Sequence, residues 1–232
     1  MSIVAFIPAR GGSERIPGKN IRKLNGHPLL AYAIAGAKRA GMFDGIYVST
    51  EDKEIARIAG QYGADTIRRP GLFSRSDSRD LHWIQHALGW LWPKDPDSFY
   101  ILRPTNPFRT SATIKRARKQ WGRSNAHSLR AMSRVKEHPN KMWKKGEVFM
   151  YPCEYPDYDL PTQMLPKNIY IQDGCIQIHR PSICRIRNDH TGAAVEGFFT
   201  EGYEGLDLNT EEDWILAEAL LERGLATLEV IE

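Results

Sequence analysis

Short apolar runs and helical repeats alternate along the first half of the chain. Residues 2–7 form an apolar, β-branched run that stops at Pro8, which predicts a buried strand followed by a loop. Beyond that loop, Pro28 suits a first helical turn, and apolar residues recur at helical spacing from Leu29 until Gly41. The same alternation predicts strands at 45–50, 65–68 and 98–103, and helices at 52–63, 80–91 and 111–121.

The alternation stops between Val135 and Asn168, where prolines and aromatic residues replace any regular period. This segment is therefore predicted to be an excursion or a small subdomain. Regular structure is predicted again as a strand at 170–180 and as a last helix at about 210–223.

Strands that alternate with helices predict a mostly parallel sheet covered on both faces, a doubly wound α/β fold of three layers. We expect one domain over residues 1–232, with an inserted excursion at about 135–180. Ligands of such folds bind at the carboxyl ends of the strands. The loops after Pro8, Ser49 and Arg103 should therefore face one site.

Composition narrows the class of protein. With 41% hydrophobic and 26% charged residues, the chain resembles ordinary globular proteins rather than disordered ones. The 32 basic and 28 acidic residues leave a net charge of +4, an excess too small to require a nucleic-acid partner. No signal peptide and no membrane-spanning run is evident, so we expect a cytoplasmic protein without a membrane partner. Cys153, Cys175 and Cys184 lack disulfide or zinc spacing and are expected to be reduced.

The segment IPARGGSERIPGKN at residues 7–20 carries the most informative chemistry. Two adjacent glycines let the backbone approach a phosphate closely, and three cations can neutralise a triphosphate. Phosphoryl transfer needs such positioning and charge rather than a nucleophilic side chain. The segment is neither a P-loop nor a GxGxxG fingerprint, because no Ser or Thr follows Lys19 and the glycines are adjacent. A solvated basic turn is the competing interpretation. The residues concerned are Gly11, Gly12, Arg10, Arg15 and Lys19.

This run resembles the nucleotide-binding signature of the acylneuraminate cytidylyltransferases. Later motifs are similar to those of the family in the same order, namely STEDKEIA at 49–56, RRP at 68–70, RPTNPFR at 103–109 and LDLNTEEDW at 206–214. The resemblance implies a nucleotide-diphospho-sugar transferase type of α/β fold, with CTP and an acidic nine-carbon sugar as substrates. It also implies a set of CTP-binding residues, which are Ala9, Arg10, Gly11, Gly12, Ser13, Arg15, Lys19, Asn20, Arg69 and Ser78.

Arg69, which precedes Pro70, looks like the arginine that contacts the cytosine ring in this family. A guanidinium can donate hydrogen bonds to O2 and N3 on the pairing edge of cytosine. Arg68 competes for the role. Alternatively, both arginines are solvated and merely flank a turn.

The motif at 103–109 departs from the usual family form, which has Gln before Pro-Thr-Ser-Pro. Arg103 is predicted to end a strand at the site. It either pairs with a carboxylate or phosphate of the acceptor or forms a structural ion pair beneath the loop, and we favour the first. The acceptor sugar is therefore not necessarily N-acetylneuraminate. The resemblance, which includes YIQDGCIQI at 170–178, implies that the substrate-binding residues are Arg103, Thr105, Asn106, Gln172, Asp173 and Gly174.

LDLNTEED is the predicted metal segment. The resemblance implies two aspartates here with one residue between them, and a loop at the end of a strand is expected for this segment. This chain supplies Asp207 and Asn209 as metal residues, and the neutral Asn209 should leave Mg²⁺ more dependent on water and the triphosphate. Asp213 instead matches the capping-box position of the last helix, with Thr210 as its N-cap. A carboxylate at the entrance of a helix is the competing interpretation of Asp207.

These residues predict a CTP-dependent transferase in which an acceptor hydroxyl attacks the α-phosphate without a covalent enzyme intermediate. Arg10, Lys19 and Asp207 are the predicted catalytic residues. Within the class, the alternatives are another nucleotide or another acid, such as a legionaminic, pseudaminic or octulosonic sugar. The alternative from a different class is a non-catalytic module that binds nucleotide sugars and has lost its metal site. The neutral Asn209 supports this alternative, whereas the retained Asp207 and the basic residues of the first loop argue against it.

The excursion carries a basic run from Lys136 to Lys145. This run is either a solvated face or, following the family, a surface that packs on a second subunit and lends basic residues to its sugar site. An apolar, aromatic and proline-rich insertion is costly to expose, so we expect a homodimer joined through residues 135–168.

Overall fold

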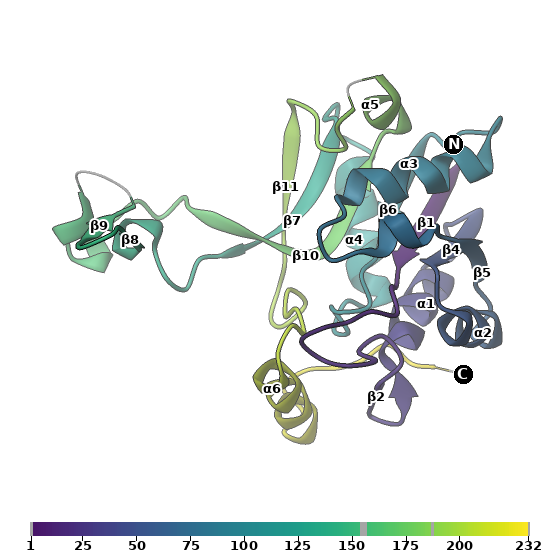
Figure 1. Cartoon of the computed structure of the whole chain (residues 1–232), viewed down its shortest axis with the longest axis horizontal. Coiled ribbons are helices and arrows are strands. Elements are labelled where there is room, and N and C mark those ends of the chain that lie inside the picture. The colour runs from purple at the N-terminus through teal and green to yellow at the C-terminus, as the bar shows by residue number, and fades with distance from the viewer. Residues whose placement is uncertain (1, 154–156, 187, 232) are drawn as a thin grey trace.

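A twisted sheet forms the centre of the molecule (Figure 1). The computed structural model describes residues 2–153, 157–186 and 188–231, and in this part of the chain the sheet has seven strands in the order β11-β7-β10-β6-β1-β4-β5. All neighbouring pairs are parallel except those of β10, which runs antiparallel to β6 and β7. The strands are β1 (Ile3–Pro8), β4 (Gly45–Thr50), β5 (Asp65–Arg68), β6 (Ser98–Ile101), β7 (Ser128–Arg134), β10 (Tyr170–His179) and β11 (Val195–Phe199).

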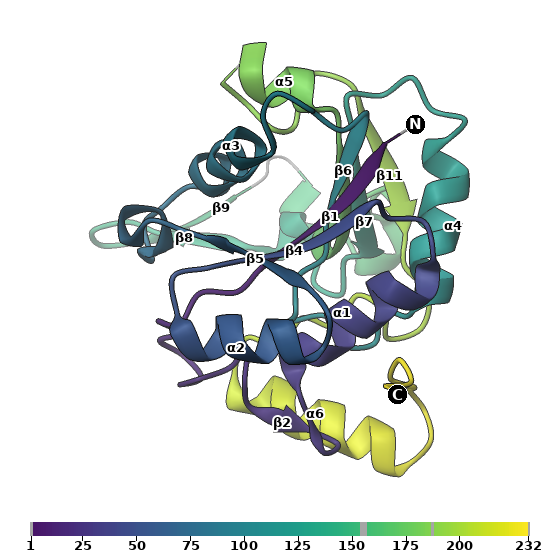
Figure 2. The ribbon, with the colours of Figure 1, turned by 90° about the vertical axis from the view of Figure 1, so that its right-hand side faces the viewer.

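Helices cover both faces of this sheet, which confirms the predicted three-layer α/β fold (Figure 2). One face packs against α1, α2 and α4, and the other packs against α3 and α5. A separate apolar cluster, which includes Ile16, Leu29 and Trp214, joins α6 to the loop after β1 and to the start of α1. The helices are α1 (Leu29–Ala40), α2 (Lys53–Gln61), α3 (Asp80–Leu91), α4 (Ser111–Trp121), α5 (Pro181–Ile186) and α6 (Glu211–Glu222).

Local side chains set the ends of these helices. Asp52 caps α2 by accepting hydrogen bonds from the backbone N–H groups of Glu54 and Ile55, at 2.7 and 2.9 Å. The predicted capping box of Thr210 and Asp213 is present at the start of α6. Gly41 ends α1 in the left-handed conformation, with φ at 65°.

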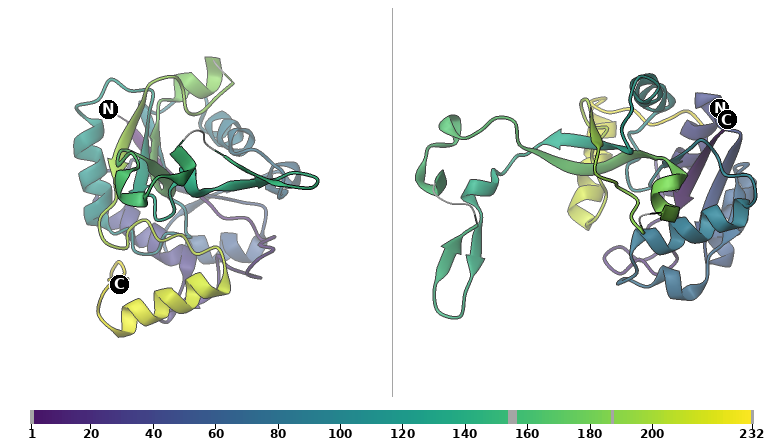
Figure 3. Two further views of the ribbon diagram at one scale, coloured as in Figure 1. Left: turned by 90° about the vertical axis from the view of Figure 1, so that its left-hand side faces the viewer. Right: turned by 90° about the horizontal axis from the view of Figure 1, so that it is seen from above.

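The predicted excursion is a long arm (Figure 3). β7 and β10 continue past the sheet, and between them lies a hairpin of β8 (Trp143–Lys145) and β9 (Met150–Pro152). His138 and Lys141 bond carbonyl oxygens within the arm, which fixes part of the basic run internally. The arm exposes many large apolar side chains, namely Met142, Trp143, Val148, Phe149, Met150, Tyr151, Met164 and Ile171.

Several elements differ from the sequence-based prediction. β7, β11 and α5 were not predicted, and neither was the small hairpin of β2 (Lys23–Leu24) and β3 (His27–Pro28). β6 ends at Ile101 instead of residue 103, so Arg103 lies in the following loop and does not end the strand. Among the described residues, no helix is both long and apolar enough to cross a bilayer. The cytoplasmic location stays a prediction.

Candidate active site

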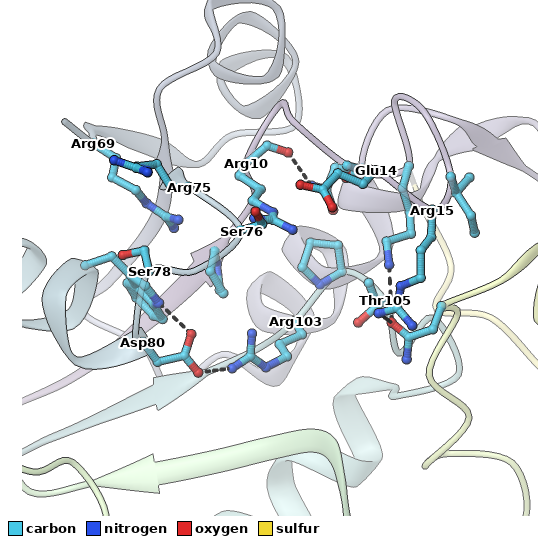
Figure 4. Close-up of a pocket in the computed structure, with 18 of the residues that line it drawn as sticks. Arg10, Glu14, Arg15, Arg69, Arg75, Ser76, Ser78, Asp80, Arg103 and Thr105 are labelled. Atoms are coloured by element: carbon cyan, nitrogen blue, oxygen red, sulfur yellow. Dashed lines mark hydrogen bonds and ion pairs between the residues drawn. The ribbon is translucent and has the colours of Figure 1, made fainter. Parts of the chain in front are cut away.

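A cavity of about 470 Å³ opens beyond the carboxyl end of β1. Figure 4 shows Arg69 at one end, Arg15 at the other and Arg10 between them. Eleven of the predicted site residues line the cavity, which are Arg10, Ser13, Arg15, Lys19, Asn20, Arg69, Ser78, Arg103, Thr105, Asp207 and Asn209. Lining residues that were not predicted include Glu14, Phe73, Arg75, Ser76, Asp80 and Trp83.

Hydrogen bonds from two backbone N–H groups anchor the glycine loop after β1. Ala9 donates its N–H to Ser49 O at 3.0 Å, and Gly11 donates to Glu51 Oε1 at 2.8 Å. A Cβ on Gly11 would lie 2.7 Å from a carboxylate oxygen of Asp52, so any larger residue there would require the side chain that caps α2 to shift. Gly12 has no such restriction. Three of the predicted CTP-binding residues, Ala9, Gly11 and Gly12, therefore belong to this loop but do not line the cavity.

Arg10, Arg15 and Lys19 project from this loop into the cavity. Asn20 ties the loop together by donating from Nδ2 to Arg10 O at 2.9 Å. Lys19 Nζ donates to Leu208 O at 2.8 Å, which joins the loop to the segment before α6. Burial lowers the pKa of Lys19, and Asp207 partly opposes this shift. Because Arg10, Arg15 and Lys19 all line the cavity, the loop concentrates basic side chains there, as its sequence predicts.

Asp207 and Asn209 lie together in a loop, as expected. Asp207 Oδ2 accepts from Asn209 Nδ2 at 2.7 Å, whereas Asp207 Oδ1 is buried without a hydrogen-bond partner among the described residues. Mg²⁺ commonly binds one or two carboxylates together with substrate phosphates and water, so the orphaned Oδ1 fits such an ion. Asn209 Oδ1 instead accepts from Arg15 Nη2 at 3.0 Å. Within the described ranges, no group of three or more His, Cys, Asp or Glu could hold a metal alone.

Arg69 lies at the other end of the cavity. Its Nε and Nη2 donate to Ser49 Oγ and Ser49 O at 3.1 and 3.0 Å, and its guanidinium lies 5.2 Å from the centre of the Trp83 ring. The side chain is buried, and burial lowers the pKa of Arg69 to about 10. Arg68 is exposed and absent from the cavity wall. Of the two arginines, Arg69 is therefore the one that lines the cavity.

Arg103 forms an ion pair with Asp80 on the cavity wall (Figure 4). Asp80 also accepts from Trp83 Nε1 at 2.9 Å. Burial opposes ionisation of Asp80, but the charge of Arg103 and these hydrogen bonds outweigh it and lower the pKa of Asp80. The structural ion pair left open by the sequence is thus present. Because the Arg103 and Asp80 side chains are 27% and 33% exposed, both remain within reach of a ligand.

Two other predicted acceptor residues, Asn106 and Asp173, do not line the cavity. Asn106 is buried and donates to the carbonyl oxygens of Asp173 and Leu206. The carboxylate of Asp173 accepts from Ser133 Oγ, Thr200 Oγ1 and its own neighbour Cys175 N, at 2.5, 2.7 and 3.0 Å. These bonds hold an irregularity in β10, where the pairing with β7 shifts between residues 172 and 177.

Gly174 occupies this irregularity with φ at 78°, a conformation that favours glycine. A Cβ there would lie 3.7 Å from Arg103 Cδ, so the stem of Arg103 packs over it. Gln172 is exposed, and its Oε1 accepts from Arg130 Nη1 at 2.9 Å. Thr105 lines the cavity and accepts from Leu208 N through its carbonyl oxygen at 2.8 Å.

Two buried arginines were missed by the sequence analysis. Arg109 Nη1 donates to Arg103 O and Cys175 O at 3.0 and 2.7 Å, which joins the loop after β6 to β10. Burial lowers the pKa of Arg109 to about 10. Arg130 on β7 is 8% exposed and donates to the neutral oxygens of Gln172 and Thr191. Arg109 stands within a recognised motif, but nothing in the sequence around Arg130 marked it.

The sequence profile described as "Cytidylyltransferase" matches residues 4–145, which include the loop after β1, Arg69 and Arg103. The chain belongs to the cytidylyltransferase family. This cytidylyltransferase is 33% identical over 232 aligned residues to the CMP-N,N'-diacetyllegionaminic acid synthase of Legionella pneumophila, covering 96% of this chain and 97% of that protein. It is 52% identical over 159 residues to the pseudaminic acid cytidylyltransferase of Campylobacter jejuni strain 81-176, covering 65% of this chain and 68% of that protein.

Solved structures support the fold. A CMP:2-keto-3-deoxy-manno-octonic acid synthetase complexed with CTP superposes with a TM-score of 0.68 at 13% identity, covering 97% of this chain and 100% of that one. A 4-diphosphocytidyl-2C-methyl-D-erythritol synthase from Anaerococcus prevotii gives a TM-score of 0.66 at 17% identity, covering 96% and 99%. The cytidylyltransferase therefore has the fold of nucleotidyltransferases, as predicted.

Proposed function

We propose that this cytidylyltransferase transfers CMP from CTP to a hydroxyl group of an acidic 3-deoxy-2-ulosonic sugar and releases pyrophosphate. The charge of the cavity carries the proposal. Among the described residues, six cationic side chains line the cavity against three carboxylates. A triphosphate with Mg²⁺ and an acidic acceptor would together supply the missing negative charge. The cations are Arg10, Arg15, Lys19, Arg69, Arg75 and Arg103.

The loop after β1 would bind the triphosphate. Arg10, Arg15 and Lys19, which line the cavity, would stabilise the charge that develops on the departing pyrophosphate while the acceptor hydroxyl attacks the α-phosphate. Asp207 Oδ1 would hold Mg²⁺, which when bound supplies further electrostatic stabilisation of the phosphates. No covalent enzyme intermediate is needed, since positioning and charge suffice for this transfer.

Arg69 would select the base. Ser49 holds two nitrogens of its guanidinium, which fixes the orientation of the group at the end of the cavity. Donation from Arg69 to O2 and N3 suits cytosine, and the relatives named as cytidylyltransferases support CTP as the nucleotide.

The acceptor would bind beside Arg103, with Arg130 and Gln172 behind it. A carboxylate on the sugar can replace Asp80 as the partner of Arg103. The names of the relatives support an acid of the legionaminic or pseudaminic type as readily as neuraminate.

We further propose a homodimer joined through the arm. Val148 and Phe149, at the end of the hairpin, are 80% and 68% exposed, and apolar side chains follow one another along this segment. A patch of this kind is unusual on a monomer and is typical of an interface.

A pyrophosphate-release assay with each nucleoside triphosphate and a panel of ulosonic acids tests the function. We expect turnover with CTP and at least one acid, and its loss in Asp207→Ala. Turnover with CTP but with neutral sugars only would refute the acceptor class. Binding of CTP without turnover on any acid would refute the assigned reaction.

A further inference from the structure

Asn209 joins three groups of the cavity through one amide. Its Nδ2 donates to Asp207 Oδ2 at 2.7 Å, and its Oδ1 accepts from Arg15 Nη2 at 3.0 Å. Lys19 Nζ lies 3.5 Å from the same oxygen. The amide thus connects the carboxylate that fits a metal to two cations of the loop after β1.

We propose that Asn209 is a positioning residue that holds Asp207, Arg15 and Lys19 in place for the triphosphate and is not itself a metal ligand. This inference rests on the proposed function, because it assigns a role in binding CTP. It also replaces the sequence-based expectation that Asn209 contributes an oxygen to Mg²⁺, since that oxygen faces Arg15.

Only a side chain with both a donor and an acceptor can make these contacts. An aspartate at position 209 would have no donor for Asp207, so two carboxylates would face each other and repel. The added charge would also pair with Arg15 and partly neutralise it before the triphosphate arrives. Asn209→Asp should therefore weaken CTP binding even where no metal is present.

The amide also orients Asp207. Asn209 holds Oδ2, and the buried Oδ1 has no hydrogen-bond partner among the described residues. A carboxylate that is held at one oxygen presents the other oxygen in a fixed direction. The entropic cost of ordering the side chain is then smaller when a cation binds. Loss of the amide should thus loosen both parts of the site.

Calorimetric titration of CTP in the presence of EDTA tests the proposal without metal and without turnover. For Asn209→Asp we expect the Kd of CTP to rise about tenfold or more, as for loss of a charge-assisted contact. Gln61→Glu, at an exposed position of α2, adds the same charge elsewhere and should leave Kd unchanged. If Asn209 were a metal ligand, Asn209→Asp would bind CTP normally in EDTA and would bind Mn²⁺ more tightly in a paramagnetic resonance titration.

A double-mutant cycle with Arg15→Ala shows whether the effect passes through the contact. In the Arg15→Ala background, Asn209→Asp should weaken CTP binding several-fold less than in the wild type. Equal penalties in both backgrounds would overturn the proposal. If Asn209→Asp does not fold, Asn209→Ala replaces it, with an expected rise in Kd of about threefold or more in EDTA. An unchanged Kd for a folded variant overturns the proposal alone, whereas failure of the wild type to bind CTP in EDTA and also with added Mg²⁺ overturns the proposed function as well.

Discussion

Replacing Arg103 by glutamine should separate the two roles that its position permits. If Arg103 binds the carboxylate of the acceptor, Arg103→Gln removes a charge-assisted hydrogen bond, which contributes roughly 1.5–3 kcal/mol to the binding free energy. The KM for the acceptor should then rise about 10–100-fold while the KM for CTP stays unchanged. Asp80→Asn should have the opposite effect and lower the KM for the acceptor, because Asp80 no longer competes for the guanidinium.

The stability of the protein should respond to both substitutions in the same direction. The Arg103 and Asp80 side chains are 27% and 33% exposed, so the pair resembles a surface ion pair more than a buried one. Breaking it should cost roughly 1 kcal/mol. For a chain of this size that cost lowers Tm by about 2–4 °C, which scanning calorimetry resolves.

A second ion pair of the chain provides the matched control. Arg185 and Asp95 are 35% and 30% exposed and lie outside the cavity wall. Arg185→Gln should lower Tm by a similar amount and leave both KM values unchanged. If Arg103→Gln lowers Tm but leaves the KM for the acceptor at its wild-type value, Arg103 has only a structural role and the acceptor site has been misplaced.

Three further outcomes are expected. Lys19→Ala should reduce kcat by about two to three decades without unfolding the protein, because it removes a transition-state contact of roughly 2–4 kcal/mol. A rate within about threefold of wild type would exclude Lys19 from the mechanism. Because burial lowers the pKa of Lys19 below its ordinary 10.5, the affinity for CTP should fall as the pH rises toward that value, and Lys19→Arg should remove this decline. Phe149→Ser should reduce the mass measured by light scattering to that of a monomer, whereas Ile215→Ser, at a residue 64% exposed on α6, should not.

The fold was predictable where one face or both faces of an element are plainly apolar. β1 and α1 are predicted within a residue or two, because their buried side chains are nearly all hydrophobic. β7 was missed because the buried Arg130 and the polar Ser133 interrupt its apolar pattern, and both are satisfied by groups distant in sequence. β11, with Glu196 and Gly197 at its centre, lacks a continuous apolar run for the same reason.

The site was predictable where residues are neighbours in sequence and unpredictable where they meet only in space. The cations of the loop after β1 stand within ten positions of one another, so their shared role is visible in the chain itself. Asp80 is 23 positions from Arg103, and nothing local announces their ion pair. Asn209 lies 194 positions from Arg15, so nothing local indicates the hydrogen bond between them.

The arm departs from the sheet and returns to it at a single point, since Arg134 at the end of β7 is paired with Tyr170 at the start of β10. This pairing joins the two ends of the arm directly, and β1, β4 and β6 lie elsewhere in the sheet. We therefore expect insertions and substitutions in the intervening segment to leave the register of the central strands unaltered.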